Sequence, residues 1–146
     1  MADAVTSTTI SDGTHKAVIQ LTNLSDGTGE SAVNKVDVSA LAAREDGTAC
    51  SGVVIEKVSH SIIGFTQVQL LFDATTNTIA LGLAQDSNGH MDFSDFGGLK
   101  NTAGSGKTGD ILLTTIGASS NDSYVNVLEL IKNYGYWLHR AHELLV

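Results

Sequence analysis

Residues 67–84 of this 146-residue chain read Gln67-Val68-Gln69-Leu70-Leu71-Phe72-Asp73-Ala74-Thr75-Thr76-Asn77-Thr78-Ile79-Ala80-Leu81-Gly82-Leu83-Ala84. Large apolar residues recur at every second position on both sides of a polar centre, as they do in strands with one buried face. The link 74–78 between the two runs is short enough to join neighbouring antiparallel strands. The stretch therefore predicts a β-hairpin and favours an all-β domain.

The same alternation recurs along most of the chain, in segments rich in Val, Ile and Thr. These segments are 17–23, 33–41, 52–63, 111–116 and 124–132. Turn-forming pairs separate several of them, namely Asp12-Gly13, Asp26-Gly27, Asp46-Gly47 and Asn88-Gly89. Residues 84–110 form a long excursion, with a short strand expected around Met91–Phe93. Together these features predict an all-β fold, a single antiparallel β-sandwich over residues 17–134 that is jelly-roll-like, with about seven or eight strands.

The two ends of the chain depart from this pattern. Residues 1–16 are small, polar and rich in hydroxyl groups, so we expect an extended N-terminal arm ordered by a partner rather than a core strand. Residues 135–146 predict a short C-terminal helix, because apolar residues follow a helical spacing at Trp137, Leu138, Ala141, Leu144 and Leu145. A helix this short must dock, either on its own sandwich or on a neighbouring subunit. A non-native extension is the third interpretation.

Composition and charge exclude several classes of protein. Charged residues make up 16 % of the chain, against about 25 % in typical soluble proteins. The net charge of −8 repels phosphates and anionic headgroups, which argues against nucleic-acid and membrane partners. No apolar run approaches the roughly 20 residues of a membrane span, and one cysteine cannot form an internal disulfide. The start Met1-Ala2-Asp3-Ala4 lacks the features of a secretion signal, so we expect synthesis in a cytoplasm.

One segment has the ending of a nucleotide-binding P-loop: Gly104-Ser105-Gly106-Lys107-Thr108. The first glycine of that motif is absent, because Asn101 stands in its place. A P-loop also leads into a helix whose N-terminus receives the phosphate, whereas residues 111–116 have the pattern of a strand. We therefore expect a Gly/Ser loop and no nucleotide site.

Candidate metal and catalytic residues are scattered. His15, His60 and His90 are isolated, and Cys50 is expected to be a buried small apolar residue. His139 and His142 could share a helix face and form a weak site between subunits, but no supporting ligand follows them. Asp86, Asp92 and Asp95 lack the spacing of a calcium loop. We therefore predict no catalytic, cofactor or metal site, and a protein that is not an enzyme.

Several sequence motifs are spread through residues 5–134, in a pattern whose match to a known family covers most of that range. They are Asp12-Gly13-Thr14, Ala17-Val18-Ile19-Gln20-Leu21-Thr22-Asn23, Asp26-Gly27-Thr28-Gly29-Glu30, Val36-Asp37-Val38-Ser39, Gly89-His90-Met91-Asp92-Phe93-Ser94, Phe96-Gly97-Gly98-Leu99, the Gly-Ser-Gly-Lys-Thr-Gly-Asp loop and the closing segment Tyr124 to Tyr134. This pattern resembles a family of small virion structural proteins of tailed bacteriophages. The resemblance implies a structural protein of the particle, without catalytic residues.

The leading functional hypothesis is a capsid decoration, or cement, protein. It would bind the outer surface of the major capsid protein lattice, and low charge suggests a surface that neighbours cover. We expect self-association as a dimer or trimer, and contacts through the N-terminal arm and the C-terminal tail. The protein would be made in the host bacterial cytoplasm and reside on the virion surface.

Two alternatives stay open. The first is a tail, neck or fibre component of the virion, where β-sandwiches also form rings and trimers. The second is a carbohydrate-binding sandwich, whose sugar platforms would be the aromatic residues Tyr124, Tyr134, Tyr136 and Trp137.

Overall fold

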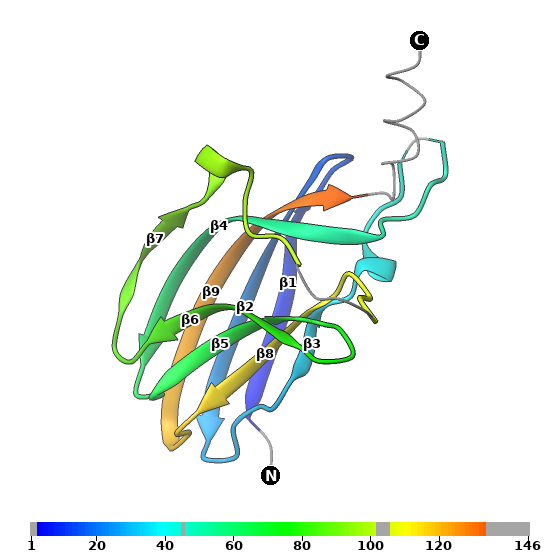
Figure 1. Cartoon of the computed structure of the whole chain (residues 1–146). Coiled ribbons are helices and arrows are strands. Elements are labelled where there is room, and N and C mark those ends of the chain that lie inside the picture. The colour runs from blue at the N-terminus through cyan, green and yellow to red at the C-terminus, as the bar shows by residue number, and fades with distance from the viewer. Residues whose placement is uncertain (1–2, 45, 102–105, 134–146) are drawn as a thin grey trace.

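The computed structural model describes residues 3–44, 46–101 and 106–133, which fold into two antiparallel β-sheets packed face to face (Figure 1). One sheet has five strands in the order β1-β2-β9-β4-β7, and the other has four in the order β3-β8-β5-β6. The strands are β1 (Ala4–Asp12), β2 (Lys16–Asp26), β3 (Val33–Val36), β4 (Gly52–Ile63), β5 (Gln67–Phe72), β6 (Thr78–Ala84), β7 (Asn88–Asp92), β8 (Ile111–Ile116) and β9 (Ser120–Asn133). The predicted all-β sandwich is confirmed.

Strands β2 to β9 form a jelly roll. The hairpin β5–β6 is its centre, and outward from this hairpin β4 pairs with β7, β3 with β8 and β2 with β9. These four strand pairs alternate between the two sheets, so the chain resembles one long hairpin rolled up on itself. The hairpin expected from residues 67–84 is thus the innermost strand pair of the jelly roll.

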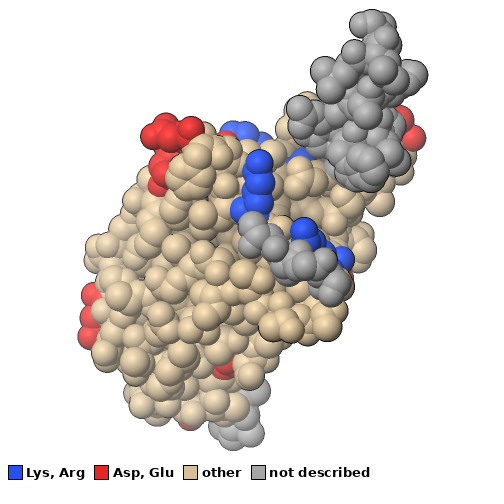
Figure 2. All heavy atoms as spheres, viewed as in Figure 1, with Lys and Arg blue, Asp and Glu red and all other residues tan. Residues whose placement is uncertain are grey.

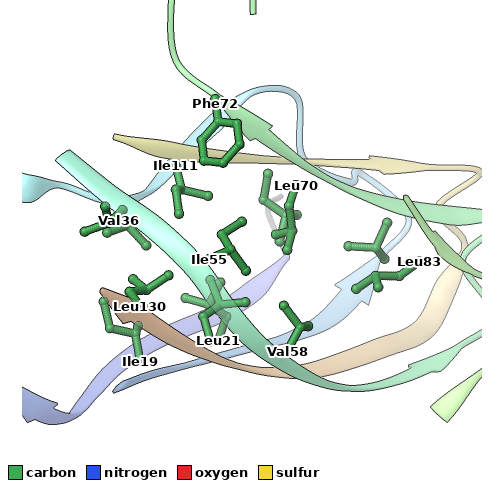
Figure 3. Packing of buried hydrophobic residues seen from close by; sticks show 14 of the residues in the cluster. Ile19, Leu21, Val36, Ile55, Val58, Leu70, Phe72, Leu83, Ile111 and Leu130 are labelled. Atoms are coloured by element: carbon green, nitrogen blue, oxygen red, sulfur yellow. The ribbon is translucent and has the colours of Figure 1, made fainter. Parts of the chain in front are cut away.

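The core lies between the sheets and follows from the two-residue period. Apart from the edge strand β1, alternate residues of the strands point inward, and the buried apolar ones form one continuous cluster (Figure 3). Ile19 and Leu21 of β2 meet Leu128 and Leu130 of β9, and the opposite sheet contributes residues such as Leu70. Phe65 and Tyr124 are in ring contact, with centroids 5.9 Å apart.

Two local expectations differ from the structure. The segment 33–41 is a strand only over β3, because a 3-10 turn, η1 (Val38–Ala40), begins where the Asp37 carboxylate accepts a hydrogen bond from the Ser39 amide. The pair Asn88-Gly89 lies inside β7, since the turn before that strand uses Asp86 with a φ of 53°. A second 3-10 turn, η2 (Ser94–Phe96), follows β7. No helix in the described ranges is long and apolar enough to cross a membrane.

The N-terminal segment also differs from the expected partner-ordered arm. Residues 4–12 form an edge strand that pairs with β2 of the same chain from Ala4 opposite Leu24 to Asp12 opposite Ala17. The strand nevertheless adds nothing to the core, because every side chain from Ala4 to Ser11 is exposed. The expected helix 135–146 lies outside the described residues.

Candidate functional site: the outer face of the five-stranded sheet

The face of the five-stranded sheet that points away from the core is largely uncharged. The strand register places its side chains in rows that cross the sheet. Three successive rows contain no acidic or basic residue except His90: Ala4–Leu24–Ser123–Ile63, Thr6–Thr22–Val125–Ser61–Asn88 and Thr8–Gln20–Val127–Ser59–His90. We call these three rows the uncharged face.

An apolar group lies at one end of the uncharged face. Leu24 of β2, Val125 of β9 and Ile63 of β4 are 54 %, 41 % and 58 % exposed. Leu24 and Ile63 both pair with Ser123, and Val125 is two residues further along β9. Val125 is therefore a diagonal neighbour of both Leu24 and Ile63, which stand on either side of Ser123, and a single partner could cover all three side chains.

Hydroxyl and imidazole groups complete the uncharged face. The Thr6 and Thr22 side chains are hydrogen-bonded across β1 and β2. Ser59 Oγ and His90 Nδ1 are 2.8 Å apart across β4 and β7. These two pairs satisfy part of the hydrogen-bonding capacity of the face. The other polar side chains of the three rows carry further hydroxyl and amide groups that a partner could bind, namely Thr8, Gln20, Ser61, Asn88 and Ser123.

The next row, Val18–Glu129–Lys57–Asp92, contains three charged side chains. Beyond it, Lys16 Nζ lies 2.8 Å from Glu56 Oε1. Hydrogen bonds from Ser94 hold the pKa of Asp92 below its usual range, and the charge of Lys57 adds to this effect. The outer face is thus divided into an uncharged part and a charged end.

The four-stranded sheet also has an uncharged outer surface, and β5, β6 and β8 contain no acidic or basic residue. Figure 2 shows this side of the molecule: most of its middle and lower surface is tan, basic side chains lie in its upper part, and acidic ones lie mainly at its upper left and left edges. Its two exposed isoleucines, Ile79 and Ile116, lie in different rows, opposite Leu71 and Gln67. This surface therefore lacks the apolar group found on the five-stranded sheet.

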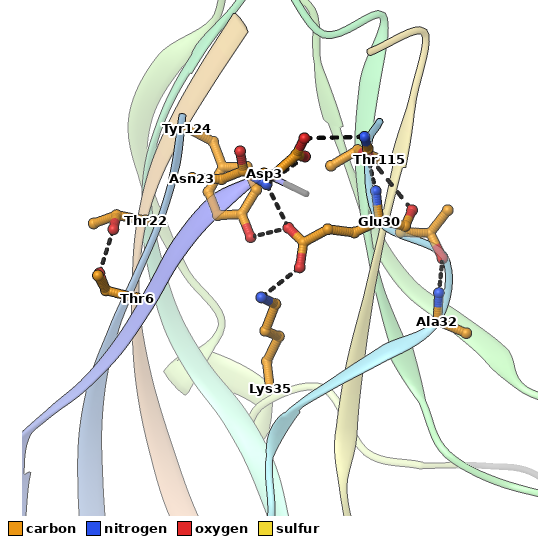
Figure 4. A network of polar contacts seen from close by, with 11 residues as sticks. Asp3, Thr6, Thr22, Asn23, Glu30, Ala32, Lys35, Thr115 and Tyr124 are labelled. Atoms are coloured by element: carbon orange, nitrogen blue, oxygen red, sulfur yellow. Dashed lines mark hydrogen bonds and ion pairs between the residues drawn. The ribbon is translucent and has the colours of Figure 1, made fainter. Parts of the chain in front are cut away.

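A buried polar cluster stands at the end of the sandwich near the start of β1 (Figure 4). Glu30 Oε1 accepts hydrogen bonds from Asn23 Nδ2 and from the Tyr124 hydroxyl, each at 2.7 Å, and Glu30 Oε2 pairs with Lys35. Burial, followed by the hydrogen bond to Glu30, raises the pKa of Tyr124 far above its usual value. Both carboxylate oxygens of Glu30 are engaged, so the cluster is a structural element rather than a site for substrate.

Two carboxylates hold β1 in place at its ends. Asp3 accepts hydrogen bonds from the side chains of Asn23 and Ser25 and from the Gly29 amide. Burial by itself would raise the pKa of Asp3, but these hydrogen bonds outweigh it and lower the pKa. At the other end, Asp12 pairs with Lys132, whose side chain is fully buried. These contacts explain why an exposed, hydroxyl-rich segment is a strand of its own sheet.

His60 lies on the inner side of β4, opposite Asn126 of β9. Its Nδ1 atom is buried without a hydrogen-bond partner among the described residues, and burial lowers the pKa of the imidazole. A lowered pKa means that the unfolded chain binds the proton more readily than the folded protein does.

We therefore expect His60 to make the protein less stable as the pH falls from 7 to 5. The free energy of unfolding contributed by this group falls as pH drops below the unfolded pKa of about 6.5, by at most about 1.4 kcal/mol per pH unit. Urea denaturation at several pH values measures the slope. His60→Gln should flatten it, because the substitution removes the imidazole whose pKa is lowered by burial. Equal slopes in wild type and His60→Gln would contradict the assignment.

The residues weighed in the sequence are not brought together. In the described ranges, no three His, Cys, Asp or Glu side chains form a metal-binding group. His60 and His90 lie on adjacent strands but on opposite faces of the sheet, and Asp86 accepts a hydrogen bond from the Gly64 amide. Cys50 is buried, and burial raises the pKa of its thiol, as expected for an unreactive cysteine. His139 and His142 lie outside the described residues.

Two other expectations concern binding motifs. Within the P-loop-like segment, Thr108 donates a hydrogen bond to Asp73, and strand β8 follows as predicted. Tyr124 is only 1 % exposed, so it cannot stack a sugar. The remaining aromatic platforms, Tyr134, Tyr136 and Trp137, lie outside the described residues.

The uncharged face was missed from the sequence because it combines four or five strands that are distant along the chain. The available signal was the absence of charge at alternate positions of 18–24, 59–63 and 123–127. Only the register shows that these positions are neighbours on one surface.

Comparisons with known proteins add little to this description. No protein-family model matches the chain, and no curated protein sequence matches it. Among solved structures, a cupin domain from Bordetella pertussis Tohama I is similar with a TM-score of 0.36 and 8 % identity, covering 91 % of this chain and 97 % of the other. A CBM4 structure has a TM-score of 0.28 and 6 % identity, covering 88 % and 94 %. Function is therefore argued from the residues of this chain.

Proposed function

We propose that this protein is a bacteriophage capsid decoration protein that binds the outer surface of the major capsid lattice and stabilises the head. The observation that carries the proposal is the uncharged face, with Leu24, Val125 and Ile63 exposed at one end of it. The motif resemblance to small phage virion proteins supports the same role. The chain acts by binding and not by catalysis.

The uncharged face suits a permanent contact for a physical reason. Burying an unpaired charged group carries the largest desolvation cost. A hydroxyl or amide group costs less, and a hydrogen bond across the contact offsets that cost, whereas aliphatic groups gain free energy when they are covered. A stable interface buries about 800 Å² on each partner, and a few well-covered residues carry most of its affinity, a part that Leu24, Val125 and Ile63 would take here. The charged end with Glu129, Lys57 and Asp92 would lie at the rim of the contact, where it favours one orientation over others.

A copy count tests the functional proposal. Particles are purified from the host that carries this gene, and the protein is quantified against the major capsid protein by mass spectrometry. A decoration protein should be present in hundreds of copies per particle. A count of six to a few dozen would instead indicate a neck, tail or fibre component, and absence from the particle would refute a virion role.

A matched pair of substitutions tests the docking face. Ile63 on the uncharged face and Ile79 on the other sheet are equally exposed, at 58 %. We expect Ile63→Asp to weaken binding to purified capsids by about a hundredfold, because an unpaired carboxylate buried in a contact costs about 3 kcal/mol or more. Ile79→Asp should bind as wild type does. Binding is measured by co-sedimentation with capsids, and equal effects of the two variants would exclude this face.

A further inference from the structure

Strand β1 has one side without a pairing strand. It lies at the edge of the five-stranded sheet, and no described strand pairs with its outer side. From Ala4 to Ser11 it contains no charged residue and no proline, the two usual guards of an exposed edge. Its bulge falls between Thr9 and Ser11, so Ala4 to Thr9 form a regular strand.

The register determines which main-chain groups point to this open side. The Lys132 amide donates a hydrogen bond of 2.8 Å to the His15 carbonyl, so the odd-numbered residues of β2 face β9. The even-numbered residues of β2 then face β1, where Gln20 pairs with Thr8 and Thr22 with Thr6. Since main-chain groups alternate in direction, those of Val5, Ser7 and Thr9 point to the open edge.

This edge is complementary to itself. When two copies of β1 are placed antiparallel about Ser7, Val5 lies opposite Thr9 and Thr6 lies opposite Thr8. The residues whose main-chain groups face outward then meet one another, which allows about six hydrogen bonds. Thr6 and Thr8 form a hydroxyl pair on the outer face, a favourable combination across strands. Asp3 lies opposite Ser11, so no like charges meet along the described strand.

We infer that β1 is a dimer interface, through which two copies of this chain join antiparallel about a two-fold axis at Ser7. The axis is normal to the sheet, so the two five-stranded sheets become one continuous sheet and the uncharged faces lie side by side. The carboxylates at the ends of β1 are turned toward Asn23 and Lys132 of their own chain, which keeps them from repelling the second copy.

The other sheet edges are less suitable. Strands β3 and β7 are short, with four and five residues, and β7 contains Asp92. Strand β6 has no charge, but its register against β5 shifts in mid-strand between Leu81 and Ile79, which divides it into two short parts. Among the edge strands of the described residues, only β1 offers an uncharged and regular run as long as Ala4 to Thr9. The inference does not depend on the virion role, because it concerns the isolated protein.

Sedimentation velocity over a range of concentrations tests the dimer. We expect wild type to reach twice the monomer mass and Ser7→Pro to associate about a hundredfold more weakly, since each copy loses one edge donor. Proline at this position removes an amide that makes no bond to β2, so thermal unfolding of the monomer should be nearly unchanged. Ser7→Ala keeps the amide and should dimerise normally. Monomeric wild type at high concentration, or dimeric Ser7→Pro, would overturn the inference.

Hydrogen exchange of wild type, measured residue by residue by NMR, gives a second readout that needs no variant. The Thr6 and Thr8 amides, bonded to β2, should be protected at every concentration. The Val5, Ser7 and Thr9 amides should exchange rapidly in dilute protein and become protected as the dimer forms. If a dimer forms while these three amides stay unprotected, association uses another surface and the inference is wrong.

Discussion

Glu30→Gln is expected to lower the free energy of unfolding by about 3 to 5 kcal/mol, the usual cost of leaving one member of a buried ion pair without its partner. Glu30 and Lys35 are paired with side-chain exposures of 6 % and 5 %. Glutamine preserves the shape of Glu30 but removes the charge that balances the Lys35 ammonium. Denaturation in urea, followed by circular dichroism, measures the change.

The double variant Glu30→Gln/Lys35→Met separates the cost of the unpaired Lys35 charge from the cost of altered hydrogen bonds to Asn23 and Tyr124. Removing both charges should recover much of the stability, because a buried ion pair adds little over apolar residues of similar size. The coupling between the two substitutions is obtained from a double-mutant cycle. A single-variant cost below about 1 kcal/mol, or no recovery in the double variant, would show that Lys35 reaches water and needs no partner.

Gly109→Ala is the second substitution with a large expected effect. Gly109 has a φ of 89°, and a Cβ atom there would lie 2.2 Å from the Ser51 carbonyl oxygen and 2.7 Å from Gly52 Cα. Both contacts are with main chain at the entry of β4, which cannot move aside without disturbing that strand. We expect a loss of about 3 kcal/mol or more, from backbone strain of about 1 to 3 kcal/mol together with the steric clash.

Gly47→Ala is the matched control for this prediction. Gly47 has the same φ of 89°, but a Cβ atom there would have no neighbour within 4 Å. Its substitution should cost only the conformational strain, about 1 to 2 kcal/mol. Thermal and urea denaturation of the two variants separate the cost of backbone strain, present in both, from the cost of the steric clash, present only in Gly109→Ala. Equal destabilisation would mean that strain alone governs both sites and that β4 yields to the added methyl group.

Both predictions concern parts of the structure that support the proposed surfaces. The Glu30 cluster includes Asn23, which binds Asp3 at the start of β1. Gly109 packs where the chain enters β4, and Ile63 at the far end of that strand belongs to the uncharged face. Binding assays on either variant should therefore be made only after its fold has been verified.

The sequence predicted the strands well where one face of the strand is buried. The runs 17–23, 52–63, 67–72, 79–83, 111–116 and 124–132 all lie within strands, because alternation of apolar residues directly reflects a sheet with one face in the core. It predicted the N-terminal segment less well. Strand β1 has exposed side chains on both faces, so it has no alternation to detect.

Polar contacts between distant residues were also beyond prediction. Glu30 and Tyr124 are 94 positions apart. No motif around either residue indicates that their side chains are hydrogen-bonded. The sequence offers Tyr124 as a sugar platform, whereas the inward position of its side chain on β9 makes it part of the core. Orientation in a strand depends on register, which a one-residue shift reverses.

The sequence alone therefore determined an acidic, low-charge β-sandwich, because composition and two-residue periodicity are properties of single strands. The tertiary structure alone decided that the uncharged positions of four or five strands form one surface and that the open edge of β1 is complementary to itself. Both features depend on pairing between strands far apart along the chain, and pairing is set by the packing of the whole core rather than by any one segment.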